Sequence, residues 1–534
     1  MRLVKLMRFT KLRVGRVAVL AIAMVTGASS AASAQVERAG YDQSAFSLGT
    51  LTPASGAMSR DLWEDTERAS VGQLLDTVPT QFDDPLHLEL LRRALLSPGA
   101  GPADADNALA GKKFMTAAQA GFYREAASLA ELVPGLRSEP ALAQVIAFQS
   151  LMDGDVDDAC ARGAGLRDGR TNDSWIKLRF VCYARAGEGP AAELTLNLLR
   201  RQDIISEADA QRYTVFAAGR LPDGGAPGRD AFDYVMARER GFVPSADFLR
   251  TASAAVVASI ARNENYPPDI RQQALLQSVA RKTIDMEEAW RLLDRLSTTP
   301  LAAEIVSVNS HLPGSLEQAE ALGSTLRGAG DDWLGFVART QLLATAVTGT
   351  SPVTNYAPYA PEIALAGMVL RQPSVVEAWI LALASDETNP ENPGKVASLL
   401  NLYAQIDPGA ARRIGSYVGV ALDPQNPVPF DAAGVEATTP LLAFVSAGLE
   451  AAEAGSQGPA ALLYLTGLNV AGDGEHGDIR NVVMGWARNT ADLDWLDRQA
   501  AFREDASLFL TGQATGGGQI IDGKPLPRPK PANN

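Results

Sequence analysis

Apolar residues recur along most of the chain at the spacing of amphipathic helices. Between residues 71 and 96 they form two short runs, one on each side of Pro85, and this spacing predicts two helices. Gly and Pro residues at 97–102 then interrupt the pattern, which resumes near residue 104. The sequence therefore predicts that the chain begins as a series of short helices.

The same pattern continues in the second half of the chain. Ser245 stands where an N-cap begins a helix. The buried face of that helix is expected to carry Phe248, Ala252, Val256 and Ile260. Because helical spacing recurs on both sides of every loop-like stretch, we expect an all-α protein.

Interruptions in the helical pattern divide the chain into segments. The clearest are 219–228, which is rich in Gly and Pro, and the Pro-rich 423–430. The expected segments are a leader at 1–34, a flexible lead-in at 35–60, helical regions at 61–218, 229–422 and 431–510, and a disordered basic tail rich in Gly and Pro at 511–534.

Three glycines recur at an interval of 33 residues, at Gly121, Gly154 and Gly187. A fixed period of this size is typical of helical-hairpin arrays, in which a permissive residue occupies the short turn. An alanine stands five residues after each glycine, at Ala126, Ala159 and Ala192. Small side chains at these positions would let the second helix of each hairpin pack closely on the first.

In two segments, 148–159 and 182–192, this stretch resembles the tetratricopeptide repeat (TPR) family. The resemblance covers about 100 residues, from about 104 to 202, and it lacks the closing proline and most of the large aromatic positions of the family. The period is also 33 residues where the family has about 34. The resemblance implies a TPR-like α-solenoid of two or three hairpins, with further irregular helical blocks around it, and a long concave groove for a peptide or protein.

The first 34 residues have the order of a secretory signal peptide. A basic stretch precedes an apolar run from residue 17 to about 27, and small residues lead to a cleavage site between Ala34 and Gln35. The apolar run is about half of the roughly 20 residues that a spanning helix needs, and no later run is long enough. We therefore expect a periplasmic or secreted protein that does not span a membrane after the leader is removed.

Charge narrows the range of partners. The chain has 48 basic and 62 acidic residues, and loss of the leader's six basic residues leaves 42 against 62, a net charge of −20. Such a protein repels phosphate backbones, so nucleic acid is not an expected partner.

Only two cysteines occur, Cys160 and Cys182. An even count in an oxidising compartment favours a disulfide, and both positions fall about level on neighbouring helices. The alternatives are two unpaired core thiols or redox chemistry, which normally uses a Cys-x-x-Cys spacing.

No arrangement of residues indicates catalysis, a metal or a cofactor. The three histidines, His87, His311 and His476, are dispersed. The acidic stretch that begins at residue 153 has Asp158 and Ala164 where an EF-hand loop requires Gly at its sixth position and Glu at its twelfth. Nucleophile-elbow, phosphate-loop and zinc-protease motifs do not occur. We therefore expect no enzyme but an exported scaffold or adaptor that binds another envelope protein or peptide. The alternatives are an envelope enzyme, such as a carboxylate-dependent hydrolase, and a small-ligand-binding protein.

Overall fold

The computed structural model describes most of the chain between residues 44 and 511. The described ranges are 44–422, 456–469 and 493–511, with Gly485, Ala487 and Ala491 as single residues before the last range and gaps at 83, 135–138, 167, 222–226, 228–229 and 353–357. The predicted leader and nearly all of the predicted tail lie outside the described residues, as does the start of the predicted block at 431–510.

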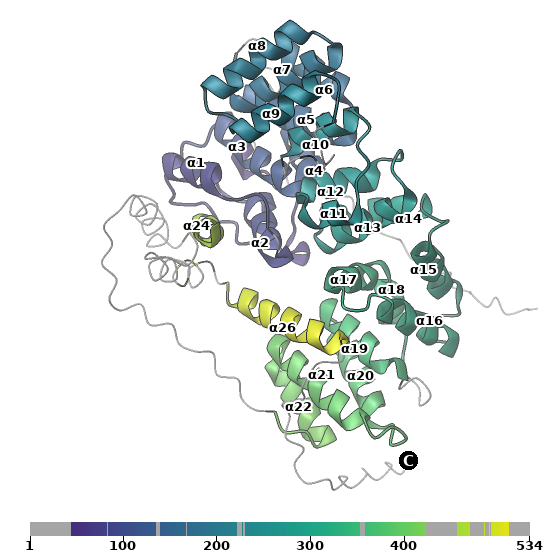
Figure 1. The fold of residues 1–534 in the computed structure, drawn as a ribbon. Coiled ribbons are helices and arrows are strands. Elements are labelled where there is room, and N and C mark those ends of the chain that lie inside the picture. The colour runs from purple at the N-terminus through teal and green to yellow at the C-terminus, as the bar shows by residue number, and fades with distance from the viewer. Residues whose placement is uncertain are drawn as a thin grey trace, which may run out of the picture. The chain divides into compact units, whose positions relative to one another are not determined.

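Helices follow one another through the described ranges, and none of the residues in these ranges forms a β-strand (Figure 1). The all-α class predicted from the apolar spacing is confirmed. The helices before the predicted break at 219–228 are α1 (Arg68–Thr77), α2 (Pro85–Leu96), α3 (Asn107–Ala117), α4 (Tyr123–Glu131), α5 (Pro140–Asp153), α6 (Val156–Gly165), α7 (Asp173–Ala186), α8 (Gly189–Arg201) and α9 (Glu207–Ala217).

The helices that follow are also short. They are α10 (Ala231–Glu239), α11 (Ala246–Thr251), α12 (Ala254–Arg262), α13 (Pro268–Ala280), α14 (Met286–Asp294), α15 (Pro300–Ser310), α16 (Leu316–Arg327), α17 (Trp333–Leu342), α18 (Ala344–Gly349), α19 (Ala360–Val369), α20 (Pro373–Ala384), α21 (Asn392–Ile406), α22 (Pro408–Val418), α24 (Gln457–Asn469) and α26 (Asp494–Leu510).

Polar side chains set where many of these helices begin. The carboxylate of Asp106 accepts a hydrogen bond from the Leu109 amide at 2.9 Å at the start of α3. Ser245 caps α11 as predicted, but the single helix expected through residue 260 is divided in two. The division occurs because Ser253 provides a second N-cap, with its hydroxyl 3.4 Å from the Val256 amide nitrogen.

Between α3 and α9, consecutive helices pack as hairpins. Helix α3 packs on α4, α5 on α6, and α7 on α8, and neighbouring hairpins meet where α3 contacts α5 and α6 contacts α7. The two regions on either side of the predicted break at 219–228 are in direct contact, since α10 packs on α5, α7 and α9. The break is therefore a connection within one packed body of helices.

Residues 44–60 are ordered, although the sequence predicts a flexible lead-in there. They form two short 3₁₀ turns, η1 (Ala45–Ser47) and η2 (Pro53–Ser55). The Phe46 side chain is fully buried and meets the Trp63 ring edge-on, with 5.5 Å between ring centres. Lys113 of α3 donates hydrogen bonds to the carbonyls of Phe46, at 2.7 Å, and Leu48, at 3.1 Å. A segment with weak helical periodicity is thus held by a few buried anchors.

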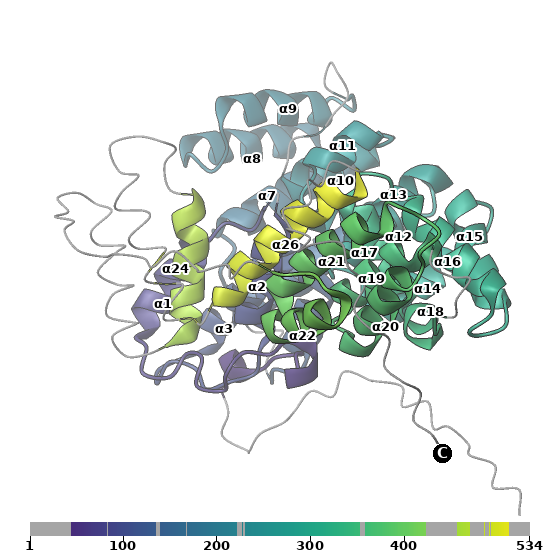
Figure 2. The same ribbon diagram turned by 90° about the horizontal axis from the view of Figure 1, so that it is seen from below.

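The last two helices return to the beginning of the chain. Helix α24 packs on α1 and α2, and the Gly458 amide donates to the Leu62 carbonyl at 2.8 Å (Figure 2). Helix α26 packs on α21 and also contacts α2 and α17. Segments that are about 400 residues apart are therefore neighbours.

None of the helices in the described ranges is both long and apolar enough to cross a membrane.

Candidate functional site

The three periodic glycines occupy equivalent places in the hairpins. Gly121, Gly154 and Gly187 have φ values of 110°, 96° and 73°, in the left-handed region that favours glycine. Gly154 and Gly187 end α5 and α7, and Gly121 lies in the π-helical turn η3 (Ala118–Phe122) between α3 and α4.

The alanines that follow them, Ala126, Ala159 and Ala192, are all fully buried on the second helices. Glycines at the turns and small buried residues on the second helices are the local features that the 33-residue period predicts.

Helix α10 packs on the first helices of two of these hairpins, α5 and α7, and on α9. Arg238 of α10 donates to the carbonyl of Leu151 at 2.9 Å, at the end of α5. Arg240, just after α10, donates to the carbonyls of Ala184 at 3.1 Å and Phe216 at 3.2 Å, near the ends of α7 and α9. A helix of the same chain therefore occupies part of the surface of these hairpins.

The cysteines form the expected disulfide. Cys160 on α6 and Cys182 on α7 are bonded, with their Cα atoms 5.8 Å apart. The bond joins the second helix of one hairpin to the first helix of the next, so it stabilises the stacking of the hairpins. The predicted cleavage site at Ala34 and Gln35 lies outside the described residues.

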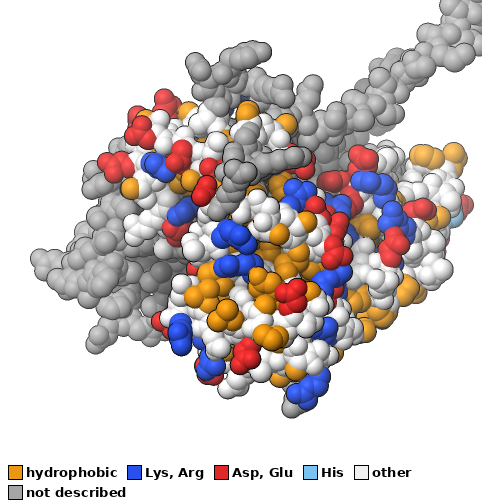
Figure 3. All heavy atoms as spheres, turned by 90° about the horizontal axis from the view of Figure 1, so that it is seen from above, with side chains coloured by type: hydrophobic (Ala, Val, Ile, Leu, Met, Phe, Trp, Pro, Cys, Tyr) orange, Lys and Arg blue, Asp and Glu red, His pale blue; other side chains and the backbone are white. Residues whose placement is uncertain are grey.

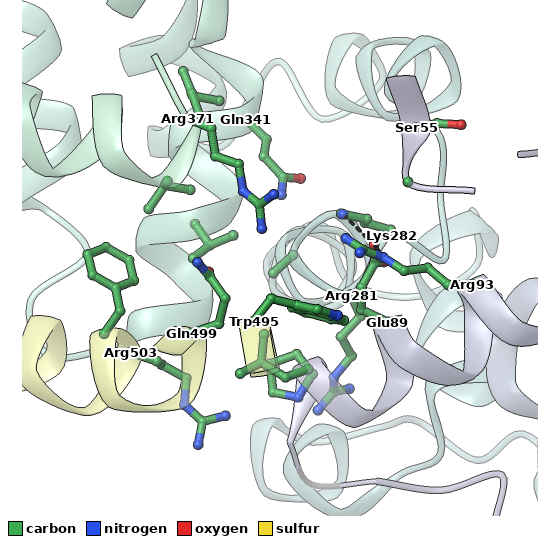
Figure 4. A pocket seen from close by; sticks show the side chains of 18 of the residues that line it. Ser55, Glu89, Arg93, Arg281, Lys282, Gln341, Arg371, Trp495, Gln499 and Arg503 are labelled. Atoms are coloured by element: carbon green, nitrogen blue, oxygen red, sulfur yellow. Dashed lines mark hydrogen bonds and ion pairs between the residues drawn. The ribbon is translucent and has the colours of Figure 1, made fainter. Parts of the chain in front are cut away.

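A cavity of about 540 Å³ lies away from the hairpins and is the candidate functional site. Its walls come from η2, α2, α17, α26 and the carboxyl ends of α13 and α19 (Figure 4). Six segments separated widely in sequence thus build one cavity. A volume of this size is within the range of about 300–1,000 Å³ that is typical of ligand sites.

The charged side chains that line this cavity are mostly basic. Five are cations and one is a carboxylate: Arg93, Arg281, Lys282, Arg371, Arg503 and Glu89. This balance is opposite to that of the whole chain, whose net charge is −14. A basic cavity in an acidic protein attracts anions while the rest of the surface repels them. We call these side chains the basic cluster.

Glu89 is the centre of the ion pairs in the basic cluster. Its carboxylate lies 2.8 Å from the Arg93 Nε and 3.0 Å from the Lys282 Nζ, and its side chain is about one-tenth exposed. Burial acts to raise the pKa of Glu89, but the charges of Lys282, Arg92 and Arg93 outweigh it and hold the pKa below its ordinary value. One carboxylate is thus shared by several cations, which leaves an excess of positive charge.

Arg371 contributes directly to that excess. No described residue forms a hydrogen bond or ion pair with its guanidinium, and its side chain is exposed. Arg503, by contrast, is paired with Asp84. In Figure 4, Arg371 and Gln341 point into the cavity, and Lys282 and Arg93 lie across from them.

Lys282 and Arg371 share an unusual backbone conformation. Their φ values are 58° and 53°, and each is the second residue after the last residue of its helix, at the position that glycine often occupies. The amides one residue later close the helix ends, Thr283 to the Ser278 carbonyl and Gln372 to the Gly367 carbonyl, both at 2.9 Å.

A left-handed conformation costs a residue with a Cβ roughly 1–2 kcal/mol. Attraction of a cation to the helix dipole returns about 0.3–1 kcal/mol, which does not offset the cost in full. Strained residues of this kind cluster at functional sites. Two basic side chains are therefore held at the cavity at a cost in stability.

Another part of the lining is apolar. Half-buried side chains of α17 and α19 form it: Trp333, Leu334, Val337, Val369 and Leu370. The Trp333 ring meets the buried Phe502 ring of α26 edge-on, with 5.8 Å between ring centres. We call this surface the apolar wall. The cavity thus offers partly exposed apolar area beside its cations.

Trp495 of α26 adds an aromatic ring to the lining. The guanidinium of Arg93 lies 4.3 Å from the centre of the Trp495 ring, within the range of a cation–π interaction. Gln341 of α17 and Gln499 of α26 add two amide groups to the lining. The cavity can therefore bind an anion, an apolar group and the polar groups between them.

Other candidates have less chemistry to offer. Within the described residues, no group of three His, Cys, Asp or Glu side chains is placed to hold a metal ion. Asp153, in the sequence that superficially resembles a calcium loop, is paired with Arg124 at 2.9 Å. On the face seen from above, hydrophobic side chains gather among scattered charges (Figure 3). The exposed Leu194 and Leu198 belong to α8, but no described feature indicates a ligand there.

Sequence reasoning did not find the basic cavity. Each lining segment is ordinary by itself, and the cavity forms only where α17 packs on α13, α19 and α26 and where α26 also meets α2. A local signal does exist at Lys282 and Arg371, where a basic residue stands in place of the glycine that ends many helices. Comparison of the chain with protein-family models, curated proteins and solved structures gave no match.

Proposed function

We propose that this protein is an exported helical scaffold, built in part from TPR-like hairpins, that binds another protein of the cell envelope. The basic cavity is the contact site for an anionic part of that partner. The observation that carries the proposal is the excess of cations around Glu89, with Lys282 and Arg371 held in strained conformations at the cavity.

The chemistry of the cavity supports binding over catalysis. A carboxylate-dependent hydrolase needs a group that gives or takes a proton near neutral pH, and a raised pKa is typical of its acid. Glu89 has a lowered pKa, so its carboxylate stays ionised, and its oxygens are engaged in ion pairs with Lys282 and Arg93. It is therefore poorly suited to either role.

Partner capture tests the proposal. The mature protein is used as bait in the native envelope fraction, with chemical cross-linking, beside a double variant, Lys282→Glu with Arg371→Glu. Both side chains are exposed, but Lys282 is paired with Glu89, so circular dichroism of the double variant checks that its fold is kept. We expect the unchanged protein to capture one partner in fixed stoichiometry and the double variant to lose it.

A matched control is Arg250→Glu, because Arg250 is 69% exposed on α11 and does not line the cavity. It should capture the partner as the unchanged protein does. Absence of a reproducible partner, or equal capture by all three proteins, would contradict the proposal. Mass spectrometry of protein from the envelope fraction tests the export step, with Gln35 expected as the first residue.

A second candidate, a receptor for a small anionic molecule, is favoured by the volume of the cavity. Such a receptor should show a rise in melting temperature with small carboxylates alone, and the double variant should lose that rise. The two candidates differ in whether a protein partner is needed.

A further inference from the structure

We propose that the basic cavity binds the carboxyl terminus of its partner polypeptide, with an apolar last residue. This inference rests on the proposed function, because it names the part of the partner that enters the cavity. A chain end of this kind brings three groups in fixed order: a terminal carboxylate, one apolar side chain, and the backbone amides before them. The cavity lining offers a counterpart for each.

The terminal carboxylate is assigned to the space between Arg371 and Lys282. Arg371 has no partner among the described residues, and its guanidinium has the planar fork that binds a carboxylate through two hydrogen bonds. Lys282 shares the carboxylate of Glu89 with Arg93, so it retains donors for a second anion. Both side chains reach the cavity from the strained ends of α13 and α19.

The last side chain of the partner is assigned to the apolar wall. Trp333, Leu334 and Val337 of α17 are half-buried there and line the cavity, so part of their apolar surface is open to a ligand. Burial of apolar surface contributes about 25 cal/mol per Å², so a seated Leu or Phe side chain adds roughly 1.5–3 kcal/mol. A purely ionic ligand would gain nothing from this wall.

The backbone before the last residue is assigned to Gln341 and Gln499. Each side-chain amide has both a donor and an acceptor, which is what a peptide bond requires of its neighbours. In Figure 4, both side chains extend toward the same space as Arg371. Gln341 lies on α17 and Gln499 on α26, so the backbone of the peptide is assigned to the space between these two neighbouring helices.

An isolated phosphate group is the competing ligand. It would use the cations of the basic cluster but neither the apolar wall nor the two glutamines. A carboxylate with an apolar neighbour uses all three parts of the lining, and the cavity volume of about 540 Å³ exceeds what a single phosphate fills. The composition of the lining therefore favours a chain end.

Fluorescence polarisation with labelled synthetic peptides tests this inference on the mature, full-length protein. The probes are hexapeptides labelled at the amino end, with Phe, Leu, Val, Ser or Lys as the last residue, each made as a free acid and as a carboxamide. We expect the free acids that end in Phe, Leu or Val to bind about tenfold more tightly, or better, than their carboxamides, as loss of a charged hydrogen bond implies.

Variants of the protein separate the two halves of the cavity. Arg371→Gln should weaken binding of the free acids about tenfold, with little effect on the carboxamides. Val337→Ser should weaken binding of peptides that end in Phe or Leu and leave the preference for acid over amide intact. Arg250→Gln serves as the control and should change neither, because Arg250 lies outside the cavity.

The inference is overturned if none of the free acids binds, if acids and carboxamides bind equally, or if inorganic phosphate displaces the peptides as well as an unlabelled free acid does. The proposed function would survive these results if the capture of the partner still depended on Lys282 and Arg371. The proposed function is contradicted by a different result, the absence of any captured partner. The two sets of outcomes are therefore distinguishable.

Discussion

Arg262 and Glu288 form a two-point ion pair, with 2.9 Å between Nε and Oε1 and 2.7 Å between Nη2 and Oε2. Both side chains are less than one-tenth exposed. The pair joins α12 to α14, and Arg124 of α4 also contacts Glu288. Three helices therefore meet at one buried carboxylate.

Replacement of this carboxylate should be strongly destabilising. Glu288→Gln would leave Arg262 buried without its counter-charge, which typically costs about 3–5 kcal/mol. Chemical denaturation should show this loss as a lower midpoint. The control is Glu287→Gln, an exposed neighbour on the same helix, which should change stability by less than about 0.5 kcal/mol. Similar losses for the two variants would contradict the role given to the pair.

The periodic glycines should differ in their tolerance of alanine. A Cβ at Gly121 would lie 2.8 Å from Thr283 Cγ2 and 3.1 Å from Ala254 Cβ, whereas a Cβ at Gly154 would meet nothing within 4 Å. Both substitutions carry the cost of a left-handed conformation, roughly 1–2 kcal/mol. Gly121→Ala adds a steric clash, so its loss of stability should be the larger by about 1 kcal/mol or more. Thermal denaturation of the two variants compares them, and equal losses would exclude a close approach at Gly121.

Stability should depend on pH through Lys113. Burial lowers the pKa of the Lys113 ammonium to about 7, from an ordinary value of 10.5. Between these values the unfolded chain binds the proton that the folded chain releases, so the free energy of unfolding rises with pH across this window. Below about pH 7 this contribution is lost.

Denaturation at pH 7 and at pH 9 measures the effect. In Lys113→Met, the part of the rise that is due to this side chain should disappear. Lys112→Met is the control, because Lys112 is 46% exposed on the same helix and pairs with Asp76 at 2.6 Å. An unchanged rise in Lys113→Met would show that the ammonium stays protonated in the folded protein.

Reduction of the disulfide should destabilise the protein. The bond closes a loop between residues 22 positions apart, which corresponds to about 3 kcal/mol in the chain-entropy model. Denaturation with and without a reductant measures the loss, and the double variant Cys160→Ser with Cys182→Ser should match the reduced protein. The double variant should not respond to the reductant, since the chain has no other cysteine.

Local features were predictable from the sequence, and features that depend on packing between distant segments were not. The left-handed turns at Gly121, Gly154 and Gly187 follow from the spacing, because a short turn between packed helices restricts which residues fit. The disulfide follows from the parity of the cysteines and their level positions on neighbouring helices. These properties involve segments that are close along the chain.

The cavity depends on contacts between distant segments, and the spacing of apolar residues does not predict such contacts. Arg93 meets Trp495 across about 400 positions of sequence, and nothing near either residue indicates the other. The order of the segment at 44–60 was not predictable for the same reason, because it depends on the hydrogen bond from Lys113 to the distant Phe46 carbonyl. Helical spacing reports which face of a helix is buried but not which distant helix buries it.

The contact of α24 with α1 and α2 has a consequence for the order of folding. During synthesis the first helices emerge hundreds of residues before α24, so the apolar area that α24 finally covers remains exposed to solvent throughout that interval. A nascent chain in this state is prone to aggregate. The helices that are synthesised first, α1 and α2, thus complete their native contacts among the last. A chaperone that shields these helices until synthesis ends should raise the yield of the folded form.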